Sequence, residues 1–297
     1  MNGLKERLQL QMNFLKAAHN FYLSKGYEPT VSPKIVPFKD DEEDHLIKVK
    51  IIGKDEDLFL SRSPQLYKEI SCLFSEAGKV YEIGPVFRGE PEGNGRRANE
   101  FLGIDAELKT ESLDDVINSL NDFIFSLKEN EYLIKFLSEN NYENHLPDEI
   151  LRIEYKQALK DLKAKKIGST EEKKLSELVN KNSSKMKWIF LTDFPAASRG
   201  FYQIKGEYTD SFDLIGQWEI CSGGLRRKDV DTYFSLLEKI GWSTKEMIPY
   251  AEIKKKQEKN TGGYGVGMER LIGTIINRIN ISEIQPYERT PEVKINF

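Results

Sequence analysis

The chain has 297 residues with 44 basic and 48 acidic side chains, so its formal net charge at pH 7 is −4. This charge argues against a protein that coats nucleic acid electrostatically, while a small nucleic-acid footprint stays compatible with it. Hydrophobic residues make up 39% of the chain, enough for a sizeable core and too many for global disorder. We find no apolar run long enough for a membrane span, no apolar signal-peptide segment and no Cys/His spacing typical of zinc. The two cysteines, Cys72 and Cys221, cannot form a disulfide scaffold, which favours a cytoplasmic location.

The first quarter of the chain predicts one long helix followed by extended segments. Apolar residues three or four positions apart indicate an amphipathic helix over residues 4–25, which ends before Gly26. Its expected buried stripe is Leu4, Leu8, Met12, Leu15, His19 and Tyr22, with His19 packed in the core. The acidic residues 39–45 are expected to form a solvated loop, and segments 46–53 and 57–61 a hairpin.

The middle of the chain predicts a helix, two strands and a long helical region. A helix is expected over residues 63–75, and strands over 79–88 and 100–109 with a hairpin loop between them. Ser112, with Asp115 three residues later, indicates a capping box at the start of another helix. Residues 129–187 are rich in lysine and glutamate and are expected to be predominantly helical, with a solvated charged face.

The last third returns to strands. These are expected at 187–193, 200–204, 211–215 and 217–222, before a helix over 228–240. A glycine-rich strand over 262–267 then leads into a helix that begins near Met268. Strands and helices occur in blocks, and this order favours an α+β fold with an antiparallel sheet flanked by helices.

The residues around the two central strands suit a nucleotide site. Arg88 at a strand end can hold a phosphate, Phe101 on the partner strand can stack on a base, and Glu90 can accept from an exocyclic amine. One arginine on one hairpin, taken alone, would favour a surface salt bridge instead. No GxxxxGK[ST] sequence occurs, which excludes a P-loop NTPase.

The last third supplies further groups with matching chemistry. The glycines of 262–267 allow a backbone to approach a ligand closely, and Arg270 follows in the first helical turn, where phosphate is favoured. Asp213 and Glu219 are carboxylates of the kind that Mg²⁺ uses beside a triphosphate. Lys68 and Arg226 are cations that can converge on a carboxylate substrate.

Five sequence blocks in this order resemble a known family. They are GYEPTVSP at 26–33, SPQLYKE at 63–69, VYEIGPVFRGE…RRANEFLGIDAE at 80–107, SFDL with EICSGGLR at 211–226, and GGYGVGMERL at 262–271. The chain is similar over nearly its whole length to the catalytic domain of archaeal-type aspartyl-tRNA synthetases, which are class II aminoacyl-tRNA synthetases. The resemblance implies one class II catalytic domain over residues 1–297, with no anticodon-binding barrel in this sequence. It also implies a homodimer formed through the segment around Pro33.

The resemblance also implies a role for each matching residue. Arg88 would hold the α-phosphate of ATP and Arg270 the γ-phosphate, and both would be catalytic. Phe101 would stack on the adenine and Glu90 would bind its amino group. Three further assignments follow: Asp213 and Glu219 as ligands of Mg²⁺, Gln65 and Asp105 facing the substrate ammonium, and Lys68 and Arg226 clamping the substrate side chain.

The sequence departs from the family pattern at several positions. Arg97 and Thr261 stand where histidines are usual, and Arg97 is counted here with the ATP-binding residues. The acidic residues 39–45 replace a flap, and Asp213 and Glu219 are six positions apart where the family has seven. Two cations in one pocket favour aspartate over the neutral asparagine, because an amide would leave one cation unpaired.

The leading functional hypothesis is an enzyme that activates aspartate with ATP as aspartyl-adenylate. The adenylate would pass to an acceptor other than tRNA, with ammonia, which gives asparagine, as the first choice. The first alternative is a truncated synthetase that charges tRNA. The second is a catalytically silent paralogue that binds a regulator, a reading weakened by the presence of both Arg88 and Arg270.

Overall fold

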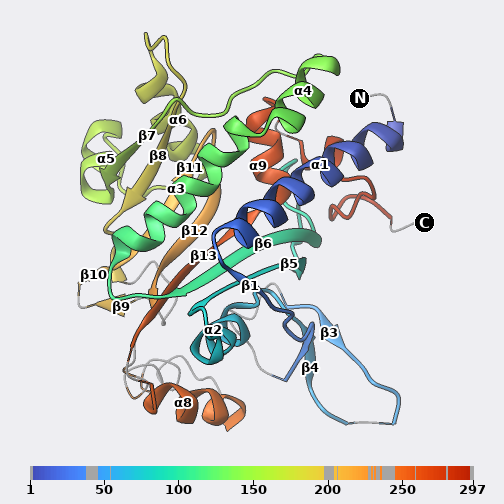
Figure 1. Ribbon diagram of the computed structural model, residues 1–297, viewed down its shortest axis with the longest axis vertical. Helices are drawn as coiled ribbons and strands as arrows, with labels where there is room; N and C mark the ends of the chain where they lie inside the picture. Colours follow the sequence, from blue (N-terminus) through green and yellow to red (C-terminus); the bar gives the residue numbers. More distant parts are fainter. Residues whose placement is uncertain are drawn as a thin grey trace.

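The computed structural model describes residues 3–37, 46–53, 55–196, 204–205, 207–226, 229, 231, 235, 245–257, 259–278 and 280–294 (Figure 1). The acidic loop 39–45 and nearly all of the expected helix 228–240 lie outside these residues. Within them, eight strands form one large sheet. Its order is β1 (Glu28–Pro29), β5 (Lys79–Phe87), β6 (Glu100–Lys109), β13 (Thr261–Gly267), β12 (Glu219–Arg226), β11 (Ser211–Ile215), β8 (Lys187–Thr192) and β7 (Glu149–Glu154).

The inner strands of this sheet pair antiparallel, which confirms the α+β class and the antiparallel sheet. Both edges differ from that expectation, because β1 pairs parallel with β5 and β7 pairs parallel with β8. The strand β7 lies in the region 129–187 that the sequence predicted to be predominantly helical. Ile150 and Leu151 are both half-buried, so this six-residue strand has no regular period-two pattern that the sequence could reveal.

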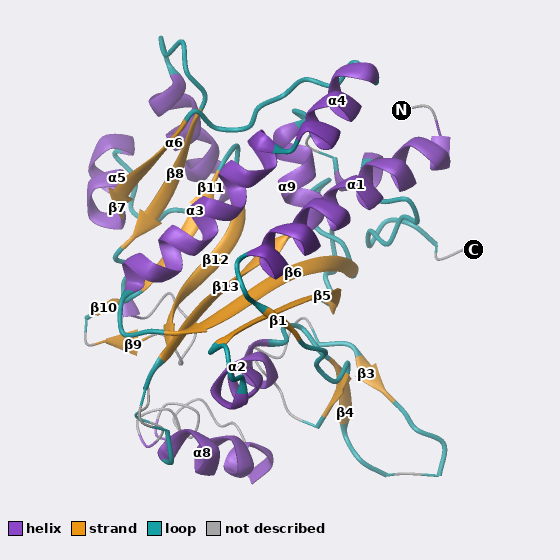
Figure 2. Ribbon diagram, viewed as in Figure 1, coloured by secondary structure: helices purple, strands orange, loops and turns teal. Residues whose placement is uncertain are grey.

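Helices cover one face of the sheet and shorter elements lie on the other side (Figure 2). The covering helices are α1 (Gly3–Ser24), α3 (Leu113–Glu129), α4 (Glu131–Glu139) and α9 (Met268–Ile275). Beside the opposite side lie α2 (Gln65–Phe74), α8 (Ile248–Lys255) and a small sheet of β2 (Ile35–Val36), β4 (Leu58–Leu60) and β3 (Lys48–Val49). The helices α5 (Tyr155–Leu162) and α6 (Ser169–Asn180) flank the β7–β8 end. The short elements β9 (Ile204–Lys205), β10 (Tyr208–Thr209), η4 (Lys245–Met247) and η5 (Ile281–Glu283) complete the described chain.

The buried stripe of α1 agrees only in part with the one that the sequence indicated, since Tyr22 is buried as expected and Leu8 and Leu15 are half-buried. Met12 is 59% exposed and His19 is also exposed, whereas Phe14 and Phe21 are buried in the core. The helix presents both an apolar stripe to solvent and another to the sheet, so spacing by three or four residues could not tell them apart. The His19 side chain is nonetheless anchored, because its Nδ1 lies 3.0 Å from the Tyr81 hydroxyl.

The helix α3 begins where the sequence predicted, but its cap has a different form. The Ser112 hydroxyl accepts a hydrogen bond from the Asp114 amide, so it is the N-cap. The Asp115 carboxylate accepts from the Thr110 hydroxyl at 2.5 Å instead of returning to the Ser112 amide, and the expected capping box was wrong in this detail.

Candidate active site

The alternation of side chains along β5 and β6 separates the core from a polar face. Ile104 and Ala106 point into the core, while Phe101, Asp105 and Glu107 share the other face, because successive residues of a strand point to opposite sides. On that face the structure contains a cavity of about 340 Å³. Nine residues that the sequence singled out line it: Gln65, Arg88, Glu90, Arg97, Phe101, Asp105, Glu219, Arg226 and Arg270.

Two arginines that lie far apart in the sequence line this cavity. Arg88 follows β5 and Arg270 lies in the first turn of α9, after β13. Burial lowers the pKa of the Arg88 guanidinium from its usual value, and the positive charge of Arg270 lowers it further. The Nε of Arg88 has no hydrogen-bond partner among the described residues. A buried cation beside a second cation favours an anionic ligand such as a phosphate.

An aromatic ring and a charged pair border the Arg88 position. The guanidinium of Arg88 lies over the Phe101 ring, 5.6 Å from its centroid. The buried Glu90 carboxylate accepts from Arg97 Nη1 at 2.7 Å, so the arginine at the usual histidine position pairs with the predicted adenine reader. The adenine roles of Phe101 and Glu90 stay predictions.

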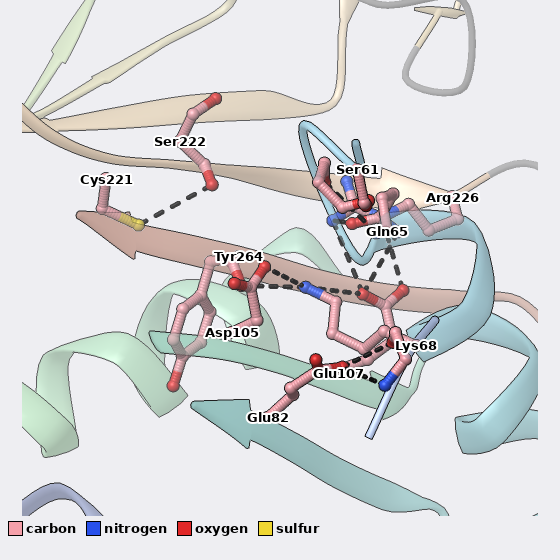
Figure 3. Close-up of polar contacts among 12 residues, drawn as sticks. Ser61, Gln65, Lys68, Glu82, Asp105, Glu107, Cys221, Ser222, Arg226 and Tyr264 are labelled. Carbon is pink, nitrogen blue, oxygen red and sulfur yellow. Dashed lines mark hydrogen bonds and ion pairs between the residues drawn. The ribbon is translucent and has the colours of Figure 1, made fainter. Parts of the chain in front are cut away.

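Lys68 and Arg226 are not two uncompensated cations, as the sequence argument assumed. Lys68 is fully buried and donates to Asp105 Oδ1 at 2.9 Å and to the Tyr264 carbonyl at 3.1 Å (Figure 3). Arg226 Nε lies 3.3 Å from Glu107 Oε1, and its Nη2 donates to Gln65 Oε1 at 2.7 Å. Lys68 does not line the cavity. The charge argument for aspartate over asparagine therefore loses its premise, because buried carboxylates already balance both cations.

The glycines of β13 serve the packing of these carboxylates rather than only a ligand's approach. A Cβ on Gly263 would lie 2.1 Å from Glu107 Oε2, and one on Gly265 would lie 2.9 Å from Asp105 Oδ1. Only glycine at these positions leaves room for two carboxylates on the neighbouring strand. The cavity-lining Gly267 differs, since its Cβ would meet Arg270 at an ordinary 3.7 Å.

The two carboxylates predicted for Mg²⁺ occupy different places. Glu219 lines the cavity, whereas Asp213 is buried beside Ser222 on the next strand and does not line it. In a regular strand, Glu219 and Ser222 would point to opposite faces because they are three residues apart. A register shift between β11 and β12 at Ile215 instead lets both side chains line the same cavity. Magnesium usually binds through one or two carboxylates together with substrate phosphates and water, and Glu219 fits that mode. Asp213 fits it less well.

Several residues of the site escaped the sequence reasoning. Arg62 is buried at the cavity wall, and its charge also lowers the pKa of Arg88. Arg96 lies over the Trp218 ring, 5.1 Å from its centroid. Glu269 lines the cavity and accepts from the Leu102 amide at 3.2 Å, and burial raises the pKa of this carboxyl to about 7. Glu107 could have been found, because it lies two residues after Asp105 on a strand and therefore on the same face.

Comparisons with known proteins agree with this arrangement. A profile of the family described as "tRNA synthetases class II (D, K and N)" matches residues 1–291. The aspartate–tRNA(Asp/Asn) ligase of Methanopyrus kandleri is 30% identical in an alignment of 290 positions that covers 92% of this chain and 65% of the relative. The aspartate–tRNA(Asp) ligase of Pyrococcus furiosus is 28% identical over 95% of this chain and 67% of the relative. The chain thus spans about two thirds of the length of these curated relatives.

Solved structures show the same fold. Asparaginyl-tRNA synthetase from Pyrococcus horikoshii, complexed with asparaginyl-adenylate, matches with a TM-score of 0.84 at 22% identity, over 99% of this chain and 70% of that one. Asparaginyl-tRNA synthetase from Entamoeba histolytica, in complex with asparaginyl-adenylate, matches with a TM-score of 0.85 at 24% identity, over 99% and 69%. From the profile match over residues 1–291 and the shared fold, the chain belongs to the class II tRNA synthetase family of the D, K and N type.

Proposed function

We propose that this chain activates aspartate with ATP and that tRNA is the acceptor of the activated amino acid. One observation carries the proposal: Arg88 and Arg270, which are far apart in the sequence, line one cavity, where desolvation and the charge of Arg270 lower the pKa of Arg88. Two neighbouring cations in one cavity favour the binding of a polyanion. Because the cavity is built from β5–β6 and from β12–β13–α9, the proposal treats residues 1–297 as one catalytic domain.

The proposed chemistry is the formation of an acyl-adenylate. A carboxylate oxygen of aspartate attacks the α-phosphorus of ATP, the bond to the bridging oxygen of the β-phosphate breaks, and pyrophosphate leaves. Arg88 would stabilise the charge that develops on the α-phosphate, and Arg270 would hold the γ-phosphate. Mg²⁺ would neutralise charge on the triphosphate when bound, and Glu219 is the carboxylate best placed to hold it.

The tRNA acceptor replaces ammonia as the first choice for a specific reason. The curated relatives described above are named as tRNA ligases, and neither name includes an ammonia acceptor. The ammonia hypothesis rested on the expected lack of an anticodon-binding barrel and on a resemblance to free-standing asparagine synthetases of the same lineage, and no residue lining the cavity favours a small acceptor. The names of these relatives also support aspartate as the amino acid. Of the residues assigned to it, Arg226 would bind its side chain, and Gln65 and Asp105 would face its ammonium group, and all three line the cavity.

Pyrophosphate exchange tests the proposed activation. With labelled pyrophosphate, the chain should form labelled ATP only when aspartate is present, and asparagine should support a much lower rate. The adenylate should then transfer aspartate to tRNA rather than to ammonia in a product assay. Exchange without transfer to tRNA would overturn the acceptor, and no exchange with either amino acid would favour a silent paralogue.

We also infer a homodimer through the segment around Pro33. Pro33 is exposed in the single chain, and Val31 and Ile35 on either side are 88% and 45% exposed. Three exposed apolar residues so close together suit an isologous contact, in which the same patch serves both subunits. Sedimentation velocity at micromolar concentration should show a dimer, and Val31→Asp should shift it to monomer. A fully active monomer in the parent would contradict this inference.

A further inference from the structure

The helix α6 belongs to the charged region 129–187, to which the sequence assigned no function. Its Leu175 is buried in one cluster with Ile189 of β8 and Ile215, the last residue of β11. Figure 1 shows α6 beside β8, which agrees with this packing. Since Ile215 pairs with Glu219 in the sheet, the apolar contact fixes α6 against the strand end that carries Glu219.

One acidic side chain of α6 reaches the Glu219 backbone. Glu172 lies three residues before Leu175, hence on the same face of the helix. Its Oε2 accepts a hydrogen bond from the Glu219 amide at 3.0 Å. Burial raises the pKa of the Glu172 carboxyl, the charge of Glu219 raises it further, and the charges of Arg96 and Arg270 oppose this. A half-buried carboxylate beside another carboxylate is destabilised by repulsion between like charges, unless its other contacts offset this.

The Glu219 residue is in turn the partner of Arg270. Arg270 Nη1 donates to the Glu219 carbonyl at 3.1 Å and lies 3.7 Å from its Oε2. The Arg270 Nε donates to the Arg96 carbonyl at 3.4 Å. The backbone of Glu219 is therefore held at both of its polar groups, because Glu172 binds its amide and Arg270 binds its carbonyl. Movement of this peptide would displace the arginine that is proposed to hold the γ-phosphate.

We propose that Glu172 is a positioning residue for the adenylation reaction. It holds the start of β12 so that Glu219 and Arg270 meet the triphosphate in one fixed geometry. It touches no reacting atom, since it does not line the cavity. The inference rests on the proposed function, and it gives the region 129–187 a part in the ATP site.

Three variants of α6 separate positioning from simple packing. Glu172→Ala removes the acceptor, so the Glu219 amide loses its partner, and the rate constant of pyrophosphate exchange should fall about 10- to 100-fold. Glu172→Gln keeps an acceptor oxygen and should recover most of that rate. Glu171→Ala is the matched control, because Glu171 is an acid in the same first turn whose nearby ion pair is with Lys174 of its own helix.

The readout is the split between kcat and the KM for each substrate. Glu172→Ala should lower kcat and raise the KM for ATP while leaving the KM for aspartate unchanged. The reason is that Glu172 binds the Glu219 amide, whereas Lys68 pairs with Asp105, and Arg226 with Glu107 and Gln65. Equal losses in both KM values, or equal rates for the alanine and glutamine variants, would contradict the positioning role. A parent that shows no exchange would overturn the proposed function itself, so the two failures are distinguishable. Melting temperatures of all three variants, compared with the parent, verify that the fold is kept.

Discussion

Arg88→Ala and Arg270→Ala should each lower the rate of aspartate-dependent pyrophosphate exchange by about 10²–10³. The expected loss is large because each guanidinium would stabilise charge that grows on the phosphates as the α-phosphorus accepts the carboxylate oxygen. Arg88 lines the cavity with its guanidinium over the Phe101 ring, and a neutral water in its place would supply no positive charge. The measurement is steady-state exchange with saturating aspartate over a range of ATP concentrations.

A control arginine outside the cavity distinguishes lost phosphate contact from the loss of a positive charge in general. Arg152→Ala removes an arginine of β7 whose side chain is 49% exposed, pairs with Asp114 and does not line the cavity. Its effect should be far smaller than that of Arg88→Ala. Parental rates in either the Arg88 or the Arg270 variant would remove that residue from the ATP site.

Lys68→Met should lower the free energy of unfolding by about 3–5 kcal/mol, the range observed when one partner of a buried ion pair is removed. Lys68 is fully buried against Asp105, and Glu107 Oε2 lies 3.8 Å from its Nζ. Removal of the ammonium leaves two buried carboxylates with less compensation. The family resemblance assigned Lys68 to the substrate side chain, but its complete burial means that a Lys68 variant should lose stability whatever its effect on aspartate use.

The double variant Lys68→Met with Asp105→Asn separates charge from packing. It removes both charges of the closest pair, so it should recover part of the stability that the single variant loses. Urea denaturation of the two single variants, the double variant and the parent gives the coupling energy between the two side chains. A double variant no more stable than Lys68→Met would show that the pair is not coupled as the 2.9 Å contact indicates.

The parts of the fold predicted well are those with strong local patterns. The strands around Arg88 and Asp105 were placed within one residue, because turn residues bound two long apolar alternations. The start of α9 followed from the glycines before Met268. Strand β7 was missed because a six-residue strand among charged helices leaves little periodic signal.

The site was predicted in composition more than in arrangement. The sequence selected nine residues that line one cavity, since their types and order match a family pattern. It could not show that Glu107 balances Arg226, or that a register shift brings Glu219 to the cavity that Ser222 also lines, because both depend on contacts between strands far apart in the sequence. The role of Glu172 could not be predicted from the sequence for the same reason, since it lies 47 positions from Glu219, whose amide it binds.

The position of β13 in the sheet bears on how the chain folds during synthesis. This strand lies between β6 and β12, and it is the strand that joins β1–β5–β6 to β12–β11–β8–β7. Until the ribosome has released the residues around 261–267, the two parts of the sheet each present an unpaired inner edge, and such edges invite pairing with other chains. Folding of the cavity must therefore wait for nearly the whole chain, and any truncation before Thr261 should produce an aggregating fragment rather than a smaller enzyme.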